Sequence, residues 1–190
     1  MSTRQLLAVL LDRDGVINFD SPDYILNPDQ WHPIPGSLEA IARLTRAGLT
    51  IAIISNQSAL ARKMVSQETF NTIHAKMMLA IEQAGGFISH VAYCPHGPDD
   101  HCFCRKPKPG MVLETLQALD IENQPEAALF VGDSIRDVQA AHGAGVPAML
   151  VQSGYGDADV ILDKSRHLQP DIRVYADLSE AVDMILQGEG

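Results

Sequence analysis

The chain has 190 residues, 46% of them hydrophobic and 20% charged, and a formal net charge of -10. This length is typical of one well-cored domain, so we expect residues 1–190 to form a single domain. The acidic balance argues against nucleic acid and acidic membranes as partners, because proteins that bind polyphosphates usually present a basic face. We therefore expect a monomer that acts on a small molecule.

The sequence carries no clear signal for export or membrane insertion. Its N-terminal apolar run is too short for the core of a signal peptide, and no later run approaches the length of a membrane span. We therefore expect a cytoplasmic protein, in which cysteines stay reduced.

The first predicted element is Leu6–Leu11, a run of six apolar residues. Such a run predicts a strand buried on both faces, as in parallel sheets covered by helices. It ends in Asp12-Arg13-Asp14-Gly15. Two carboxylates one residue apart repel each other and are costly to bury, so we expect a cation between Asp12 and Asp14. Magnesium, which prefers oxygen ligands, is the candidate.

Downstream, predicted strands and helices alternate, and the proline-rich segment 20–35 is predicted to be a loop near the end of the first strand. Alternation predicts right-handed βαβ units and an α/β fold with a doubly wound, mostly parallel, Rossmann-like sheet and a minimal cap. In chain order the predicted elements are helix 37–48, strand 49–54, helix 66–85, strand 87–93, helix 111–119, strand 127–131, helix 138–144, strand 146–151, strand 172–175 and helix 179–186.

Polar side chains follow the predicted strands, and the carboxyl ends of parallel strands meet at one edge of a sheet. Asp12 is the predicted nucleophile toward phosphorus, and Asp14 would protonate the leaving oxygen and later take a proton from water. Asp133 would complete a magnesium site with Asp12 and Asp14. Ser55 can donate to a phosphate oxygen, and Lys106 can neutralise its charge. This pattern indicates phosphoryl transfer.

A second set of residues is predicted to bind the rest of the substrate. Specificity should come from the loops beside the strand ends, at 20–24, 56–58 and 105–108, with the Arg105 guanidinium available as a fork for phosphate. The predicted substrate-binding residues are Asp20, Tyr24, Asn56, Gln57, Ser58, Arg105 and Ser134.

All three cysteines of the chain lie in residues 94–104. Cys94 and His96 form one pair and Cys102 and Cys104 another, and this sulfur and nitrogen ligand set suits tetrahedral zinc better than disulfides in a reducing compartment. Four protein ligands would close the zinc to water. We therefore predict a structural zinc in this loop that orients Arg105 toward the pocket.

Four motifs in chain order resemble those of the haloacid dehalogenase-like phosphohydrolases. They are Asp12-Arg13-Asp14-Gly15, Ile54-Ser55-Asn56-Gln57, Arg105-Lys106-Pro107 and Val131-Gly132-Asp133-Ser134. The Cys-x-His and Cys-x-Cys pairs are similar to those of the zinc-containing branch, which includes heptose bisphosphate and histidinol-phosphate phosphatases. Departures from the heptose branch occur where it usually has glycines or a lysine, at Ala59, Lys63 and Tyr155.

The resemblance implies a magnesium-dependent phosphoric monoester hydrolase that works through an aspartyl-phosphate. It favours D-glycero-D-manno-heptose 1,7-bisphosphate, cleaved at the 7-phosphate, as the substrate, which implies a role in making lipopolysaccharide core precursors. Histidinol phosphate is the alternative substrate, although its cationic groups would be repelled by the cations at 105–108. An alternative of a different class is a phospho-aspartate receiver domain. Its phosphorylated aspartate ends the third strand, where this chain has Cys94.

Overall fold

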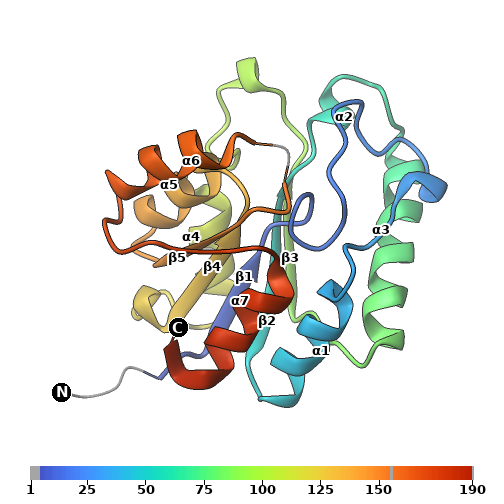
Figure 1. The fold of residues 1–190 in the computed structure, drawn as a ribbon. Coiled ribbons are helices and arrows are strands. Elements are labelled where there is room, and N and C mark those ends of the chain that lie inside the picture. The colour runs from blue at the N-terminus through green and yellow to red at the C-terminus, as the bar shows by residue number, and fades with distance from the viewer. Residues whose placement is uncertain (1–4, 155, 190) are drawn as a thin grey trace.

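The computed structural model describes residues 5–154 and 156–189, which contain one six-stranded sheet in the order β3-β2-β1-β4-β5-β6 (Figure 1). All neighbouring strands pair in parallel, which confirms the predicted doubly wound α/β fold. The strands are β1 (Ala8–Leu11), β2 (Thr50–Asn56), β3 (His90–Cys94), β4 (Ala128–Gly132), β5 (Ala148–Val151) and β6 (Arg173–Tyr175).

Helices connect these strands, and five of them match the predicted segments. The α-helices are α1 (Ser37–Arg46), α2 (Ser58–Ala61), α3 (Gln67–Gln83), α4 (Gly110–Ala118), α5 (Ile135–Gly143), α6 (Ala158–Arg166) and α7 (Leu178–Met184). Short helical turns are η1 (Pro28–Gln30), η2 (Pro98–Asp100), η3 (Pro125–Ala127) and η4 (Ile185–Glu189). The sequence pattern does not predict α2, which is a single turn, or α6, whose only buried residue is a serine.

Helix α3 illustrates how local sequence sets these elements. The Ser66 side chain accepts a hydrogen bond from the Thr69 backbone N–H at 3.0 Å and so caps the first turn. Apolar residues then recur every three or four positions and are buried on one face. They are Phe70, Ile73, Met77 and Ile81.

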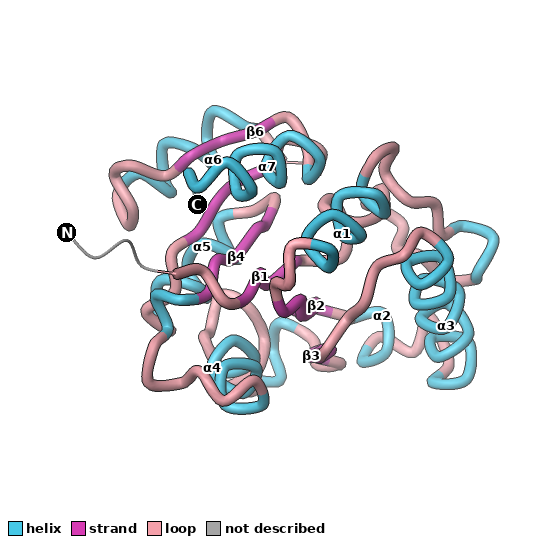
Figure 2. Tube along the Cα trace, turned by 90° about the horizontal axis from the view of Figure 1, so that it is seen from below, coloured by secondary structure: helices cyan, strands magenta, loops and turns pink. Residues whose placement is uncertain are grey.

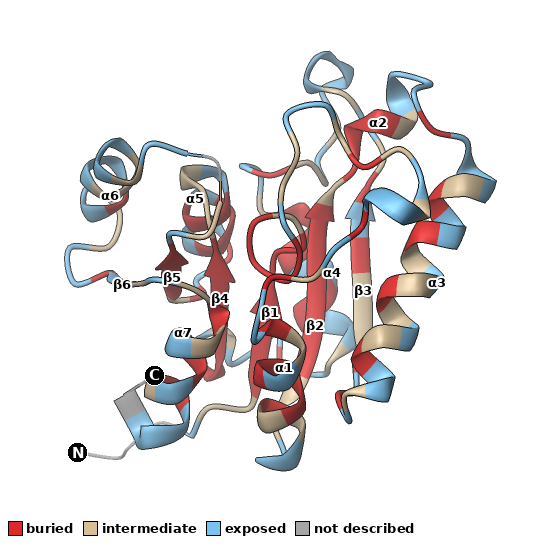
Figure 3. Ribbon diagram, turned by 45° about the vertical axis from the view of Figure 1, so that its right-hand side comes forward, coloured by how far each residue is buried: buried red, intermediate tan, exposed pale blue. Residues whose placement is uncertain are grey.

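The sheet is covered on both faces, because successive side chains of each strand point to opposite sides. In β1, Val9 and Leu11 pack with α1, α3 and α7, whereas Ala8 and Leu10 pack with α4 and α5. Figure 2 shows α1 on one side of the sheet and α4 and α5 on the other. The central strands are buried along their length, as Figure 3 shows, which explains their continuous apolar sequences.

The strand order reverses at β1, since β2 and β3 lie on one side of it and β4, β5 and β6 on the other. In open α/β sheets, ligands bind at the carboxyl ends of the strands next to such a reversal. Asp12 follows β1 and Asp133 follows β4, so the fold brings two predicted site residues to this point.

No described helix is both long and apolar enough to cross a membrane.

Candidate active site and metal centres

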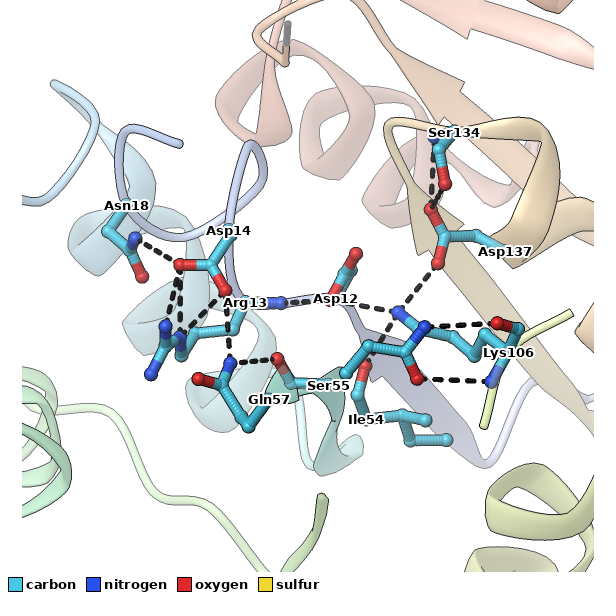
Figure 4. A network of polar contacts seen from close by, with 11 residues as sticks. Asp12, Arg13, Asp14, Asn18, Ile54, Ser55, Gln57, Lys106, Ser134 and Asp137 are labelled. Atoms are coloured by element: carbon cyan, nitrogen blue, oxygen red, sulfur yellow. Dashed lines mark hydrogen bonds and ion pairs between the residues drawn. The ribbon is translucent and has the colours of Figure 1, made fainter. Parts of the chain in front are cut away.

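A buried ammonium lies between two carboxylates at the centre of the site. Lys106 Nζ is 2.9 Å from Asp12 Oδ1 and 2.6 Å from Asp137 Oδ1 (Figure 4). Lys106 as a whole is only 2% exposed. Lys106 Nζ also donates to the Ile54 carbonyl oxygen at 2.9 Å. The ammonium therefore has a fixed position, and it holds the Asp12 carboxylate in one orientation.

The backbone of Lys106 is held by Asn56 at the end of β2. Asn56 Oδ1 accepts from the Lys106 N–H and Asn56 Nδ2 donates to the Lys106 carbonyl oxygen, both at 3.0 Å. These two bonds fix a loop residue to the rigid sheet. Asn56 lies on the cavity wall as predicted, but its amide is engaged with backbone, which favours a positioning role over contact with substrate.

Asp137, the other carboxylate that pairs with Lys106, also lies in the first turn of α5. The structure shows both contacts: Oδ1 pairs with Lys106, while Oδ2 accepts from the Ser134 N–H at 3.0 Å and from Ser134 Oγ at 2.6 Å. Burial acts to raise the pKa of Asp137, but the Lys106 ammonium and the bonds from Ser134 outweigh it and lower the pKa. Ser134, which was predicted to bind substrate, donates its hydroxyl hydrogen bond to Asp137.

Asp12 and Asp133 show the opposite electrostatic effect. Burial raises the pKa of Asp12 to about 7, against the opposing effect of Lys106 and with a contribution from Asp137. Burial, followed by the charges of Asp137 and Asp12, raises the pKa of Asp133 to about 9. Two carboxylates that resist ionisation in this way would be stabilised in their charged forms by a bound cation.

The donor set and the local backbone fit magnesium. Carboxylate oxygens of Asp12, Asp133 and Asp137 lie within 4.8 Å of one another. A side chain in place of either Gly15 or Gly154 would collide with the Asp133 carboxylate, so both glycines make room for that group. Magnesium is commonly held by one or two carboxylates together with substrate phosphate and water. Asp12 and Asp133 can supply those carboxylates, because Asp137 is engaged with Lys106 and Ser134.

The Asp14 side chain lies outside this group. Its carboxylate accepts hydrogen bonds from Arg13, Asn18 and Gln57, at distances of 2.8 to 3.1 Å. These donors hold the carboxylate apart from the Asp12 and Asp133 oxygens, so the structure does not support the prediction that the Asp14 side chain ligates magnesium. Asp14 does line the same cavity, as a general acid must.

The cavity at this strand edge has a volume of about 250 Å³, and its wall includes all the predicted catalytic and substrate-binding residues. Ser55 is 3% exposed and accepts a hydrogen bond from Gln57 Nε2 at 2.7 Å, so its own hydroxyl proton can be directed to a phosphate oxygen. Arg136 also lines the cavity, as does Asp20, whose pKa is raised by burial and by the Asp14 charge.

One wall comes from the proline-rich loop, which is tied to α3. Lys76 Nζ donates to the carbonyl oxygens of Pro28 at 2.6 Å and Trp31 at 3.3 Å, and the Trp31 ring is buried. This anchor fixes the loop that carries Asp20 and Tyr24 to the cavity. The predicted loop therefore lies where the sequence placed it.

The four predicted zinc ligands converge. Cys94 Sγ is 3.6 Å from both His96 Nδ1 and Cys102 Sγ and 3.2 Å from Cys104 Sγ, and all four ligand atoms lie within 4.8 Å of one another. Two sulfurs bound to one tetrahedral zinc lie about 3.8 Å apart, so the cluster has the dimensions of such a site. Burial and hydrogen bonds with the other two thiols raise the pKa of Cys94 to about 12.

Comparison with known proteins identifies the family. The haloacid dehalogenase-like hydrolase model matches residues 5–145. The chain is 45% identical over 179 residues to the D-glycero-beta-D-manno-heptose-1,7-bisphosphate 7-phosphatase of Bordetella bronchiseptica, covering 94% of this chain and 97% of that one. It is 41% identical over 185 residues to the enzyme of the same name from Pseudomonas aeruginosa, covering 97% and 99%. The chain belongs to the haloacid dehalogenase-like hydrolase family.

A solved structure supports the same assignment for this hydrolase. The B. bronchiseptica heptose bisphosphate phosphatase, crystallised with magnesium and phosphate, superposes with a TM-score of 0.87 at 44% identity, covering 95% of this chain and 98% of that one. Membership rules out the receiver-domain alternative. It also agrees with the third strand, which ends in Cys94 and carries no carboxylate.

Sequence reasoning missed three residues of the site: Arg13, Asn18 and Arg136. Arg13 lies between the two aspartates of the first motif, and this position of a cation was the available sequence signal; in the structure Arg13 is 6% exposed. Asn18 is fully buried, and its position four residues after Asp14 indicates nothing by itself. Arg136 stands one residue before Asp137 and reaches the cavity only because α5 begins at the end of β4.

Two of the three positions that depart from the heptose branch, Ala59 and Lys63, differ in backbone conformation. Lys63 adopts a φ of 55°, the left-handed conformation that glycine adopts most easily, so the backbone keeps the shape expected of glycine there. Ala59 is buried within α2 and meets no such requirement. Tyr155 lies outside the described residues.

Proposed function

We propose that this hydrolase is a magnesium-dependent phosphatase that removes the 7-phosphate of D-glycero-D-manno-heptose 1,7-bisphosphate. The central observation is a single cavity that contains a buried aspartate nucleophile, a fixed ammonium, a serine hydroxyl and two peripheral arginines. Relatives at 41% and 45% identity, matched over nearly their whole length, bear the name of that activity. We also propose that the protein acts in the cytoplasm as a monomer.

In the proposed reaction an Asp12 oxygen attacks phosphorus and the bond from phosphorus to the sugar oxygen breaks. The hydrogen bonds from Lys106 Nζ at 2.9 Å and from the Arg13 N–H at 2.7 Å fix Asp12 Oδ1 and so orient the attack. Asp14 gives its proton to the departing sugar oxygen. Water then attacks the aspartyl-phosphate, Asp14 takes a proton from it, and Asp12 is regenerated.

Two metal ions complete the proposal. Asp12 and Asp133 would hold magnesium, which when bound neutralises charge on the transferring phosphoryl oxygens. Ser55 and Lys106 act on the same oxygens from the protein side. Cys94, His96, Cys102 and Cys104 would hold a structural zinc, which would order the loop that carries Arg105 and Lys106.

The second phosphate of the substrate provides the basis for selectivity. Arg105 and Arg136 both line the cavity, and each can bind a phosphate through its guanidinium fork. Lys108 does not line this cavity, and its ammonium donates to the carbonyl oxygens of Cys102 at 2.6 Å and His101 at 3.3 Å. Histidinol phosphate offers cations where the arginines require an anion.

Steady-state assays with magnesium test this function. We expect kcat/KM for the heptose bisphosphate to exceed that for histidinol phosphate by orders of magnitude, with phosphorus NMR showing that the 1-phosphate is retained in the product. Arg105→Ala and Arg136→Ala should each lower kcat/KM for the bisphosphate by about 10- to 100-fold, the usual effect of losing a charged hydrogen bond. Arg173→Ala, at an exposed position on β6, is the control. A preference for histidinol phosphate would reject the proposed substrate.

A further inference from the structure

The Asp14 carboxylate is held by three neighbouring side chains, but its two oxygens are held differently. Oδ1 accepts from Arg13 Nη2 at 2.8 Å and from Asn18 Nδ2 at 2.9 Å. Oδ2 accepts from Gln57 Nε2 at 3.1 Å, and Arg13 Nε lies 3.1 Å from both oxygens. Figure 4 shows Asn18 and Gln57 on different sides of this carboxylate.

A carboxylate oxygen offers about two lone-pair positions. On Oδ1 both are filled by short hydrogen bonds, one of them from a guanidinium. Oδ2 receives only the longer contacts and lies on the side of Gln57, which also donates to Ser55 at 2.7 Å. Ser55 is proposed to donate a hydrogen bond to a phosphate oxygen. We therefore take Oδ2 as the oxygen of Asp14 that faces the reacting group.

Arg13 is suited to hold this arrangement because it contacts both acids. Its backbone N–H donates to Asp12 Oδ1 at 2.7 Å, while its side chain, 7% exposed, pairs with Asp14. The Arg13 carbonyl oxygen accepts from the Asn18 N–H at 3.1 Å, which closes the turn that brings Asn18 to Asp14. A planar fork can hold one oxygen with Nη2 while Nε stays near both, and a lysine ammonium cannot do this.

We propose that Arg13 is a positioning residue that anchors Asp14 Oδ1, so that Oδ2 carries the transferred proton. The proposal rests on the phosphatase reaction described above. In the first half the proton passes from Asp14 Oδ2 to the sugar oxygen as its bond to phosphorus breaks. In the second half water attacks phosphorus, its proton passes to Oδ2, and the bond between Asp12 and phosphorus breaks.

The leaving group provides the first test. 4-Nitrophenolate departs without a proton, and kcat/KM reports only the steps up to loss of the leaving group. Arg13→Met should therefore lower kcat/KM for the heptose bisphosphate by about 100-fold or more, the usual contribution of general acid catalysis, but lower it by less than about 3-fold for 4-nitrophenyl phosphate. Arg13→Lys should give an intermediate loss, and Arg173→Met is the control. Equal losses for both substrates would overturn the proposal.

A double-mutant cycle provides a second test that uses one substrate. If Arg13 acts through Asp14, Arg13→Met should have little further effect on kcat/KM in an Asp14→Asn protein. Losses that multiply would show that Arg13 acts in another way, such as general support of the loop. Circular dichroism and thermal unfolding of each variant identify any that fail to fold, and Arg13→Lys, which keeps the charge but lacks the planar fork, can then replace Arg13→Met in both tests.

The two proposals can fail separately. If the wild type does not hydrolyse the heptose bisphosphate, the proposed substrate is rejected. The same comparison, run with fructose 1,6-bisphosphate as the alkyl phosphate, then still decides whether Arg13 positions Asp14.

Discussion

The phosphoryl-transfer centre, formed by Asp12, Lys106, Asp133 and Asp137, and the cysteine-rich loop, residues 94–104, are neighbours in which we expect different forces to fix the side chains. The centre lies at the ends of buried strands, and its Lys106 is 2% exposed. The loop contains only one short helical turn, and its Phe103 is 64% exposed. A hydrophobic core can hold charged groups in fixed positions, whereas a short exposed loop needs ligands to one ion for the same purpose.

The two regions meet at Arg105 and Lys106, which follow the last cysteine directly. Lys106 is fixed from the sheet by Asn56 and Ile54, so its position depends on the core. Arg105 Nη1 donates to the His96 carbonyl oxygen at 3.1 Å, so its position depends on the loop. Disturbing the core should therefore affect chemistry and stability together, while disturbing the loop should mainly affect substrate binding.

Removing the nucleophile should have the largest effect. Asp12→Asn should lower kcat by about 10⁵-fold or more, because an amide does not attack phosphorus, while the zinc content stays unchanged. Phosphate release assays and acid-quench trapping of the aspartyl-phosphate measure this, with Asp159→Asn on the surface of α6 as the control. Substantial turnover by the folded, magnesium-loaded variant would disprove the nucleophile.

Removing the central ammonium should lower the stability of the core, an effect that does not depend on the loop. Lys106→Met leaves the Asp12 and Asp137 carboxylates without their shared partner, and breaking a buried ion pair typically costs about 3 to 5 kcal/mol. Urea unfolding should show this loss, whereas the exposed Lys164→Met on α6 should change little. Full stability in the Lys106 variant would mean that the core does not depend on this cation.

Removing one loop ligand should have a smaller effect on turnover. Cys104→Ser should lose zinc, increase proteolysis within 94–110 and lower kcat/KM by up to about 100-fold through a misplaced Arg105. Elemental analysis and limited proteolysis measure the first two. His101→Asn is a matched control, because His101 lies in the same loop outside the ligand group and its φ of 50° is one that asparagine accepts. A zinc-free wild type with full activity would disprove the zinc site.

The last prediction concerns the dependence of stability on pH. The folded state raises the pKa of Asp12 to about 7 and of Asp133 to about 9, from 3.8. Between these values it binds more protons than the unfolded chain, so without magnesium the unfolding free energy should fall as pH rises from about 4 to about 9. The lowered pKa of Asp137 acts in the opposite direction only in acid, where its stabilising contribution is lost.

Magnesium should reverse this trend, because it favours the ionised carboxylates. At 100 times its Kd at the higher pH, magnesium should add about 2.7 kcal/mol to the unfolding free energy of zinc-loaded protein, and the same concentration should add less at the lower pH. Thermal unfolding above and below pH 7, with and without added magnesium, measures both effects. An equal gain at all pH values would show that magnesium binds elsewhere.

The sequence by itself predicted the strands, the α/β class of the fold and most of the residues that line the cavity. Leu6–Leu11 predicts a buried strand because its residues are apolar on both faces, and the polar residues after each strand meet because parallel strands end at one edge. The cysteine and histidine spacing likewise predicted the ligand cluster, since all four donors lie within eleven residues of chain.

Only the tertiary structure decided which polar groups contact each other. Asn56 and Lys106 are 50 residues apart, and Gln57 and Asp14 are 43 apart, so no local pattern could pair them. The separation of Asp14 from Asp12 and Asp133 depends on the Arg13, Asn18 and Gln57 donors. Hydrogen bonds are directional and short in range, so roles that depend on them are settled by packing and cannot be deduced from residue type.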